Sequence, residues 1–117
     1  MGDEQITRKK YFNMLQSVKD FMRDQPGDVK QELNNIIWKL EVEGTLSSPY
    51  GEKMGDDGLF VIRVIQAGNI RVFYAYGCDD IIYGLHGYVK KSEEAPEHEK
   101  KQALKVLKAL VKGGLIK

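Results

Sequence analysis

The sequence predicts a single α+β domain: an antiparallel sheet of about four strands, with an N-terminal helical hairpin and a C-terminal helix packed on it. Residues 59–91 form three apolar runs rich in Val, Ile, Phe and Tyr, separated by short turn sequences. Apolar residues recur at helical spacing both before and after this stretch. A chain of 117 residues can bury a core of its own, so we expect one domain over residues 1–117.

The three apolar runs are broken at residues 67–69 (AGN) and 77–80 (GCDD). Gly, Asn and Asp tolerate the backbone angles of tight reversals, so the pattern predicts a three-stranded antiparallel meander. Residues 4–10 add a weaker signal for a short edge strand, whose charges would discourage unwanted pairing.

From Tyr11 the apolar positions recur at helical spacing as far as Pro26, which predicts the first helix. Asp28 is expected to cap a second helix that runs to Gly44. The short connection predicts that the two helices form an antiparallel hairpin across the sheet. Residues 45–58 carry loop chemistry throughout.

Pro96 suits the first turn of a third helix, because its missing amide costs nothing there. An apolar stripe then continues to Gly113, where the helix should end; it comprises Ala103, Leu104, Leu107, Leu110 and Val111.

The charge is unevenly spread along a chain of net charge +1. Residues 1–86 contain 10 Lys and Arg against 13 Asp and Glu, whereas residues 87–117 contain 8 Lys against 4 Glu. The basic C-terminal part permits a phosphate-rich partner, and a plain solvated helix face is the alternative.

One cysteine, Cys78, cannot form an internal disulfide, which suits a reducing compartment and a cytoplasmic protein. The longest apolar run is far shorter than the ~20 residues of a membrane span, and the charged N-terminus is unlike a secretory signal. We therefore expect no membrane association.

No dinucleotide, P-loop, zinc or catalytic-triad motif occurs, so no cofactor and no metal are expected. What remains is a cationic and aromatic set around the meander. It comprises Arg63, Arg71, His86, Tyr88, Lys90 and Lys91, with Tyr74, Tyr76 and Tyr83 nearby.

Arg63 and Arg71 stand inside apolar runs, where a charge is costly to desolvate. An odd-numbered loop between their strands places both side chains on one face, whereas a two-residue loop places them on opposite faces. Arg63 is either a ligand or a structural residue that pairs with an acid of the second helix, such as Glu41 or Glu43.

His86 is either a hydrogen-bonded structural residue or an acid or base, since histidine titrates near neutrality. Tyr88 is either a core residue or a ring on which an RNA base stacks. Lys90 and Lys91 directly follow the last strand, which should hold them more firmly than a free tail, although plain surface remains the alternative.

Three blocks carry a family resemblance: residues 58–63 (GLFVIR), 68–74 (GNIRVFY) and 85–91 (LHGYVKK), followed by Pro96 and a lysine-rich helix. They resemble the HigB-type toxins of the RelE/ParE superfamily, whose phage-related members run close to GLYELR, GNIYRIFYF and LLHGFVKKTQKTP. The resemblance covers residues 53–110.

This resemblance implies a RelE-like fold and the toxin of a type II toxin–antitoxin system. Many relatives are ribosome-dependent mRNA endoribonucleases, or mRNA interferases, that inhibit translation without a metal. The implied partners are a helix-turn-helix antitoxin of the HigA type, in a possible toxin–antitoxin heterotetramer, together with the ribosome and mRNA. The alternative is a non-catalytic toxin of the same fold, either a ParE-like gyrase inhibitor or a degenerate toxin.

Matched residue by residue, Arg71 takes the place of the family's arginine at the start of the middle strand. Lys90 and Lys91 take the place of the basic pair after the last strand. Arg71, His86, Lys90 and Lys91 are therefore the predicted catalytic residues, and Arg63 and Tyr88 the predicted RNA-binding residues.

Overall fold

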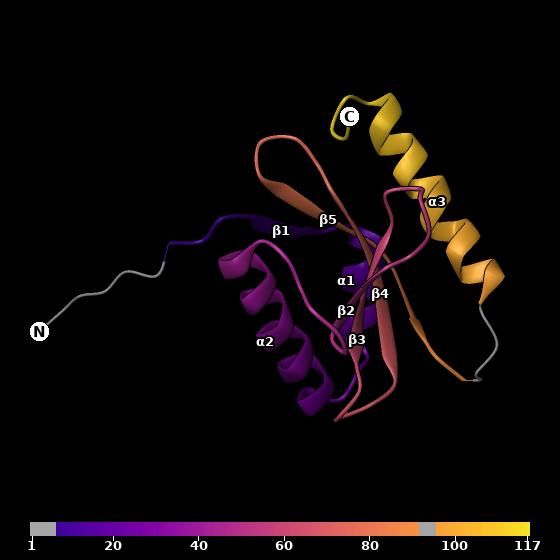
Figure 1. Ribbon diagram of the computed structural model, residues 1–117. Helices are drawn as coiled ribbons and strands as arrows, with labels where there is room; N and C mark the ends of the chain where they lie inside the picture. Colours follow the sequence, from indigo (N-terminus) through magenta and orange to yellow (C-terminus); the bar gives the residue numbers. More distant parts are fainter. Residues whose placement is uncertain (1–6, 92–95) are drawn as a thin grey trace, which may run out of the picture.

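The computed structural model describes residues 7–91 and 96–117 as an α+β fold (Figure 1). The elements in chain order are β1 (Tyr11–Met14), α1 (Gln16–Arg23), α2 (Gly27–Glu43), β2 (Gly51–Lys53), β3 (Phe60–Val64), β4 (Ile70–Tyr76), β5 (Ile81–Val89) and α3 (Glu97–Lys112). The strands form one five-stranded sheet in the order β1-β5-β4-β3-β2. The predicted fold class is confirmed.

The meander of β3, β4 and β5 is antiparallel, as predicted. Val64 pairs with Ile70 across the first hairpin, so the loop between these strands is odd-numbered and longer than the three residues suggested by the turn sequence. In the second hairpin Asp79 and Asp80 both adopt positive φ, at 58° and 61°. Asp tolerates this left-handed backbone better than most residues, which explains its place in the turn.

Helices cover both faces of the sheet, and Figure 1 shows α2 and α3 on opposite sides of the strands. On one face α1 and α2 pack against Ile62, Val64, Ile70, Val72, Tyr74 and Ile82. On the other face Ala103 and Leu107 of α3 pack against Leu59, Val61, Phe73, Ala75, Tyr83 and Leu85. We call these the α1/α2 face and the α3 face.

The third helix has the predicted bounds, with Pro96 at its N-cap and Gly113 at its C-cap. No helix in the described ranges is long and apolar enough to cross a membrane.

The N-terminal prediction is wrong in its details. The stretch that begins at Tyr11 opens as strand β1, which pairs in parallel with β5, and helix α1 begins only at Gln16. A stretch of four residues is too short to distinguish the period of a strand from that of a helix, and pairing with β5 makes this one a strand. Within the predicted edge strand, residues 7–10 are not a strand and residues 4–6 lie outside the described part.

Two further details of the structure differ from the prediction. The loop after α2 contains a short strand, β2, whose three residues are too few to give a periodic signal. The cap of α2 is Pro26 rather than Asp28, which lies inside the first turn and accepts a hydrogen bond from Val29 N instead.

A β-bulge in β5 determines which side chains share a face. Tyr74 pairs with Gly84, but the next residue of β4, Phe73, pairs with His86, so Leu85 is an extra residue. Leu85 and His86 therefore both lie on the α3 face. If the same residues ran through β5 without a bulge, regular alternation from Gly84 would place His86 and Tyr88 on the α1/α2 face.

Two glycines let other elements approach β5 closely. A Cβ at Gly84 would lie 2.9 Å from the Phe12 ring of β1, and one at Gly87 would lie 2.7 Å from the Phe21 ring of α1. Only glycine fits at these positions without a shift of the neighbouring ring.

Candidate functional site

Four of the predicted site residues meet on the α3 face, beside the first turn of α3. Arg63 lies directly opposite Arg71 across β3 and β4, and Arg71 lies directly opposite Tyr88 across β4 and β5. His86 is two residues before Tyr88 on the same strand and faces the same way. The odd-numbered loop therefore places both arginines on one face, which the sequence had left open.

Arg71 is a buried cation, with 9% of its surface exposed. Its guanidinium donates a hydrogen bond to the Ile70 carbonyl, 3.1 Å away. It forms no ion pair with any acid in the described part of the chain. Burial, and then the positive charge of Arg63, lower the pKa of Arg71, yet an arginine stays protonated at neutral pH. The result is a fixed positive charge for which the described residues supply no counter-ion.

Arg63 forms an ion pair with Glu52 of the neighbouring strand β2. The expected partners, Glu41 and Glu43, are wrong, because they belong to α2 on the opposite face of the sheet. Glu41 instead accepts a hydrogen bond from Phe12 N at 2.8 Å. Of the two opposed arginines, one is thus neutralised by a carboxylate.

His86 is held by Glu99, from the first turn of α3, with 3.0 Å between Nε2 and Oε1. An ionised carboxylate only accepts hydrogen bonds, so Nε2 is the donor and carries a proton. In the neutral ring Nδ1 then has the free lone pair. This arrangement, an imidazole oriented by a carboxylate, is suited to general-base chemistry.

Tyr88 stands between these groups. Its ring is nearly parallel to those of Phe73 and His86, with centroids 5.7 and 6.3 Å away. Burial raises the pKa of the Tyr88 phenol; Arg71 opposes the rise, Glu99 adds to it and Arg63 opposes it. The phenol is therefore neutral at neutral pH and can donate a hydrogen bond, but it does not act as a general base.

Lys90 and Lys91 follow β5 directly, at the end of the sheet where the β3–β4 loop lies. The backbone of Lys90 is fixed on both sides, because its N–H donates to the Asn69 carbonyl and its carbonyl accepts from Asn69 Nδ2 at 2.8 and 2.7 Å. Lys90 is partly buried and Lys91 is exposed. Alternation along β5 assigns Lys90 to the face of Tyr88 and Lys91 to the other.

The remaining tyrosines of the meander serve the fold. Tyr74 lies on the α1/α2 face, where burial and the neighbouring Tyr76 raise the pKa of its phenol. Tyr76 donates a hydrogen bond to the Gly44 carbonyl at the end of α2, and Tyr83 is buried under α3.

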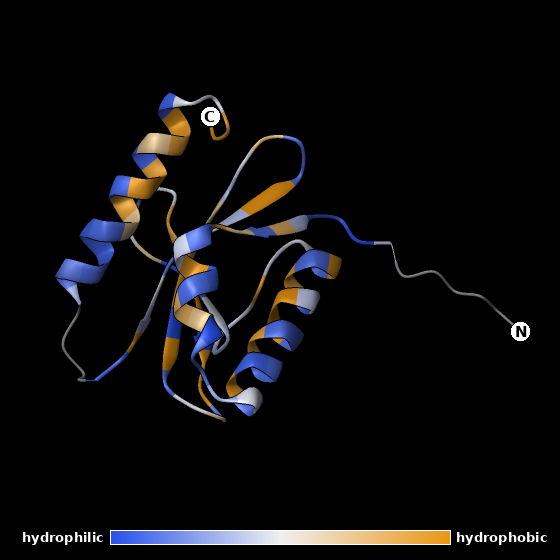
Figure 2. Ribbon diagram, turned by 180° about the vertical axis from the view of Figure 1, so that it is seen from behind, coloured by the Kyte–Doolittle hydropathy of each residue, from blue (hydrophilic) through white to orange (hydrophobic). Residues whose placement is uncertain are grey.

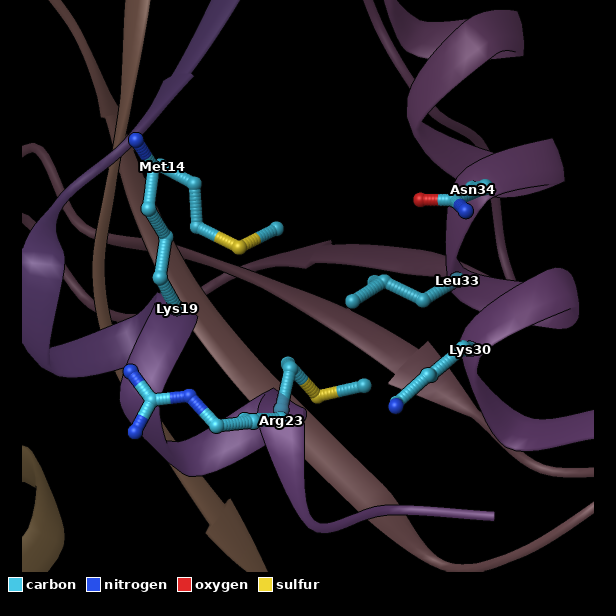
Figure 3. Close-up of a pocket in the computed structure, with 7 residues that line it drawn as sticks. Met14, Lys19, Arg23, Lys30, Leu33 and Asn34 are labelled. Atoms are coloured by element: carbon cyan, nitrogen blue, oxygen red, sulfur yellow. The ribbon is translucent and has the colours of Figure 1, made fainter. Parts of the chain in front are cut away.

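A separate cleft of about 250 Å³ opens between α1 and α2 (Figure 3). Its walls are Met14, Lys19, Met22, Arg23, Lys30, Leu33 and Asn34. This lining has cations and thioethers but no carboxylate or imidazole, so it contains no acid–base pair. It belongs to the face of the sheet opposite Arg71 and His86.

Two acids of the site, Glu52 and Glu99, were missed by sequence reasoning. Glu99 had one usable signal, since it lies in the first turn of a helix that follows the basic pair closely. Glu52 had none, because the strand that carries it was not predicted. Among the described residues no three His, Cys, Asp or Glu side chains gather into a possible metal site.

The fold and the site together define a small α+β protein of RelE-like arrangement, with a cationic and imidazole cluster on one sheet face. The chain belongs to the family of phage-derived Gp49-like proteins, whose model matches residues 20–108. That family is related to the RelE and HigB toxins. The comparison with curated proteins gives no match.

Proposed function

We propose that this protein is the toxin of a type II toxin–antitoxin pair and that it cleaves mRNA on the ribosome as a metal-independent endoribonuclease. The observation that carries the proposal is Arg71, a buried cation without a carboxylate partner in the described chain, two strand positions from the His86–Glu99 pair. Membership of a family related to the RelE and HigB toxins supports it.

Arg71 gives the site an affinity for anions. Its charge is desolvated and lies opposite a second guanidinium, so an incoming phosphate would relieve both the burial cost and the repulsion between the two arginines. A planar guanidinium also binds phosphate through two parallel hydrogen bonds. Lys90, assigned to the same face, would add to the positive field.

The reaction needs a base, a stabilised phosphorane and an acid. His86 Nδ1 would take the proton of the 2′-hydroxyl, whose oxygen then attacks the phosphorus. Arg71, with Arg63 beside it, would stabilise the negative charge that builds on the phosphate oxygens. The bond to the 5′-oxygen breaks, and Lys90, on the same face as Arg71, would supply the proton for the leaving group, so that the products are a 2′,3′-cyclic phosphate and a 5′-hydroxyl. Lys91, on the other face, would have no part in this proton transfer.

The ribosome would supply what this small site lacks. Orienting the mRNA removes a large part of the barrier, so modest chemical groups suffice once the substrate is positioned. Tyr88 would stack on a base next to the scissile phosphate. A helix-turn-helix antitoxin would complete the system, in a toxin–antitoxin heterotetramer.

The test is inducible expression with mapping of cleaved transcripts, for the wild type and for Arg71→Ala. We expect growth arrest and new 5′-hydroxyl ends on translated transcripts for the wild type only. A reporter transcript whose start codon is removed should keep its 5′ ends intact in the same cells, because cleavage requires a translating ribosome. Growth arrest with intact transcripts would contradict the proposal and would favour a partner-binding toxin such as a gyrase inhibitor, which supercoiling assays would then detect.

A further inference from the structure

The outward face of α3 carries a row of lysines that plays no part in the proposed chemistry. Residues 101, 105, 108 and 112 are all Lys, and a spacing of four, three and four residues keeps them within ~60° around the helix axis. All four are exposed, and none forms an ion pair with a described residue. We call these four residues the lysine stripe.

The lysine stripe is not interrupted by acidic residues, and the packing of α3 on the sheet holds it in place. Residues 100–117 contain no Asp or Glu, so nothing on the later turns of α3 neutralises it. The opposite side of the helix, at Ala103 and Leu107, is buried against the sheet. Figure 2 shows hydrophilic and hydrophobic stretches alternating along α3, as this division requires. From Lys101 to Lys112 the row is about 16 Å long.

The chemistry of the stripe favours the phosphates of a nucleic acid. The first three lysines also line a surface hollow of about 370 Å³ with His98, Gln102 and Leu104, which adds hydrogen-bonding groups to the positive charge. Residues 97–112 contain no Phe, Tyr or Trp, so the stripe has no ring on which an unpaired base would stack. A membrane surface fits poorly, because an interfacial helix must insert the apolar face that α3 buries against the sheet.

We propose that the lysine stripe binds the phosphate backbone of double-helical RNA and forms a second RNA contact, separate from the site at Arg71. The identity of this RNA rests on the proposed function, under which the duplex would be ribosomal RNA. The stripe begins two residues after Glu99, the partner of His86. RNA held along α3 therefore lies beside the cleavage site and leaves Arg71 free for the messenger.

The test compares two variants with the same change in net charge. The stripe variant replaces Lys101, Lys105, Lys108 and Lys112 with Gln. The control variant replaces four exposed lysines outside α3, namely Lys9, Lys19, Lys39 and Lys53, with Gln. Gln and Lys have similar helix propensities, so α3 should persist, and circular dichroism with thermal melting checks this. Binding to a fully paired RNA hairpin is measured by fluorescence anisotropy over a salt series, with Arg71→Ala in every protein to prevent cleavage.

We expect the wild-type stripe to contribute roughly 3 to the slope of log K against log salt, at about 0.7–0.9 for each phosphate contact. The stripe variant should lose that part of the slope, and the control variant should keep it. Equal behaviour of the two variants would overturn the proposal, as would a stripe-dependent affinity for phosphatidylserine vesicles as high as that for RNA. Tighter binding to an unstructured RNA than to the hairpin would also overturn it.

Failure of this inference and failure of the proposed function are distinguishable. If the wild type cleaves no transcripts while the stripe still governs hairpin binding, the endoribonuclease is wrong and the RNA contact stands. If transcripts are cleaved while both variants bind the hairpin alike, the stripe is a solvated helix face.

Discussion

At the scale of single residues, the site depends on charges that the fold leaves only partly compensated. Arg63 has a carboxylate partner and Arg71 has none among the described residues. A buried charge without a partner lowers stability, so its presence indicates a task other than stability. His86 has a carboxylate partner, because Glu99 bonds its Nε2, while Nδ1 has no hydrogen-bond partner among residues 7–91 and 96–117.

Replacing Arg71 by methionine tests whether the cation serves function alone. Met fills a similar volume without charge, so Arg71→Met removes the desolvation cost and the repulsion from Arg63. We expect an unchanged or higher melting temperature and a loss of RNA cleavage of at least about 10²-fold. Arg71→Lys should rescue little, because the planar fork is lost. A large drop in melting temperature for Arg71→Met would identify a structural arginine.

Under the proposed function Glu99 positions the imidazole, so its effect on cleavage should pass through His86. We expect His86→Asn to lower the single-turnover cleavage rate roughly 10²- to 10⁴-fold. Glu99→Gln should lower kcat less and leave KM unchanged, since the amide oxygen still accepts the ring N–H. The decisive measurement is the double variant, which should be no slower than His86→Asn alone. Additive losses would show that Glu99 acts independently of the imidazole.

At the scale of elements, the β3–β4 loop is the part that fixes the site. Glu32 of α2 accepts hydrogen bonds from the backbone N–H groups of Ile65, Gln66 and Ala67, at 2.6–3.2 Å. The same loop continues to Asn69, which holds the backbone of Lys90. A helix on one face of the sheet thus fixes a loop that positions residues of the other face.

The loop anchor predicts a pH-dependent stability. Burial raises the pKa of Glu32, but the three backbone hydrogen bonds together outweigh it and hold the pKa of this carboxyl below its usual range. Because the folded-state pKa is the lower one, the stabilisation is present at neutral pH and is lost as the pH falls through that pKa. Glu32→Gln should cost about 1 kcal/mol at pH 7, and the difference from wild type should shrink in acid. Urea unfolding at several pH values measures this, with the exposed Glu43→Gln as the control expected to change little.

A second prediction at this scale concerns Lys90 and Lys91, which directly follow β5. Neutralising both lysines with Lys90→Gln and Lys91→Gln should weaken RNA or ribosome binding and flatten its salt dependence by roughly one to two phosphate contacts. Unfolding free energy should change by less than about 0.5 kcal/mol, because these are surface substitutions. Unchanged binding together with unchanged toxicity would make the pair plain surface.

At the scale of the whole molecule, the sheet separates two sets of features. The α3 face carries the arginines, the imidazole and the helix with the lysine stripe, whereas the α1/α2 face carries the cleft between the helices. The edge strand β1 is joined to the rest of the sheet by pairing with β5 and by Glu41, a buried residue of α2.

Glu41 should therefore be important for global stability. Its carboxylate accepts from Phe12 N and pairs with Arg8, and its backbone carbonyl accepts from Lys9 N and Lys10 N. Glu41→Ala leaves a backbone amide without its charged partner, so we expect a loss of about 1–3 kcal/mol in the unfolding free energy. Hydrogen exchange should show β1 opening first. Glu43→Ala, two residues away and exposed, is the matched control and should be nearly neutral.

Patterns within the chain predicted the meander, the third helix and the residues that gather on the α3 face. Charged and polar groups inside apolar runs are visible in a sequence, and Arg63, Arg71 and His86 were found in this way. The identity of the first strand was not visible, since Tyr11–Met14 is too short to distinguish one period from another and β5 lies about seventy residues away. The partners Glu52 and Glu99 depend on tertiary packing, which no local pattern records.

The extra residue in β5 shifts the alternation of its side chains between the two sheet faces by one position. Before Leu85 the odd-numbered residues of the strand face α3, and after it the even-numbered ones do. A relative that lacks this leucine would direct its histidine and tyrosine towards α3 through regular alternation alone, because the histidine would then directly follow the glycine. A relative that keeps the leucine but lacks the bulge would direct both side chains towards α1 and α2. Comparison within the family should therefore count the residues between the turn and the histidine before it compares their identities, because that number indicates whether β5 needs a bulge to direct the histidine towards α3.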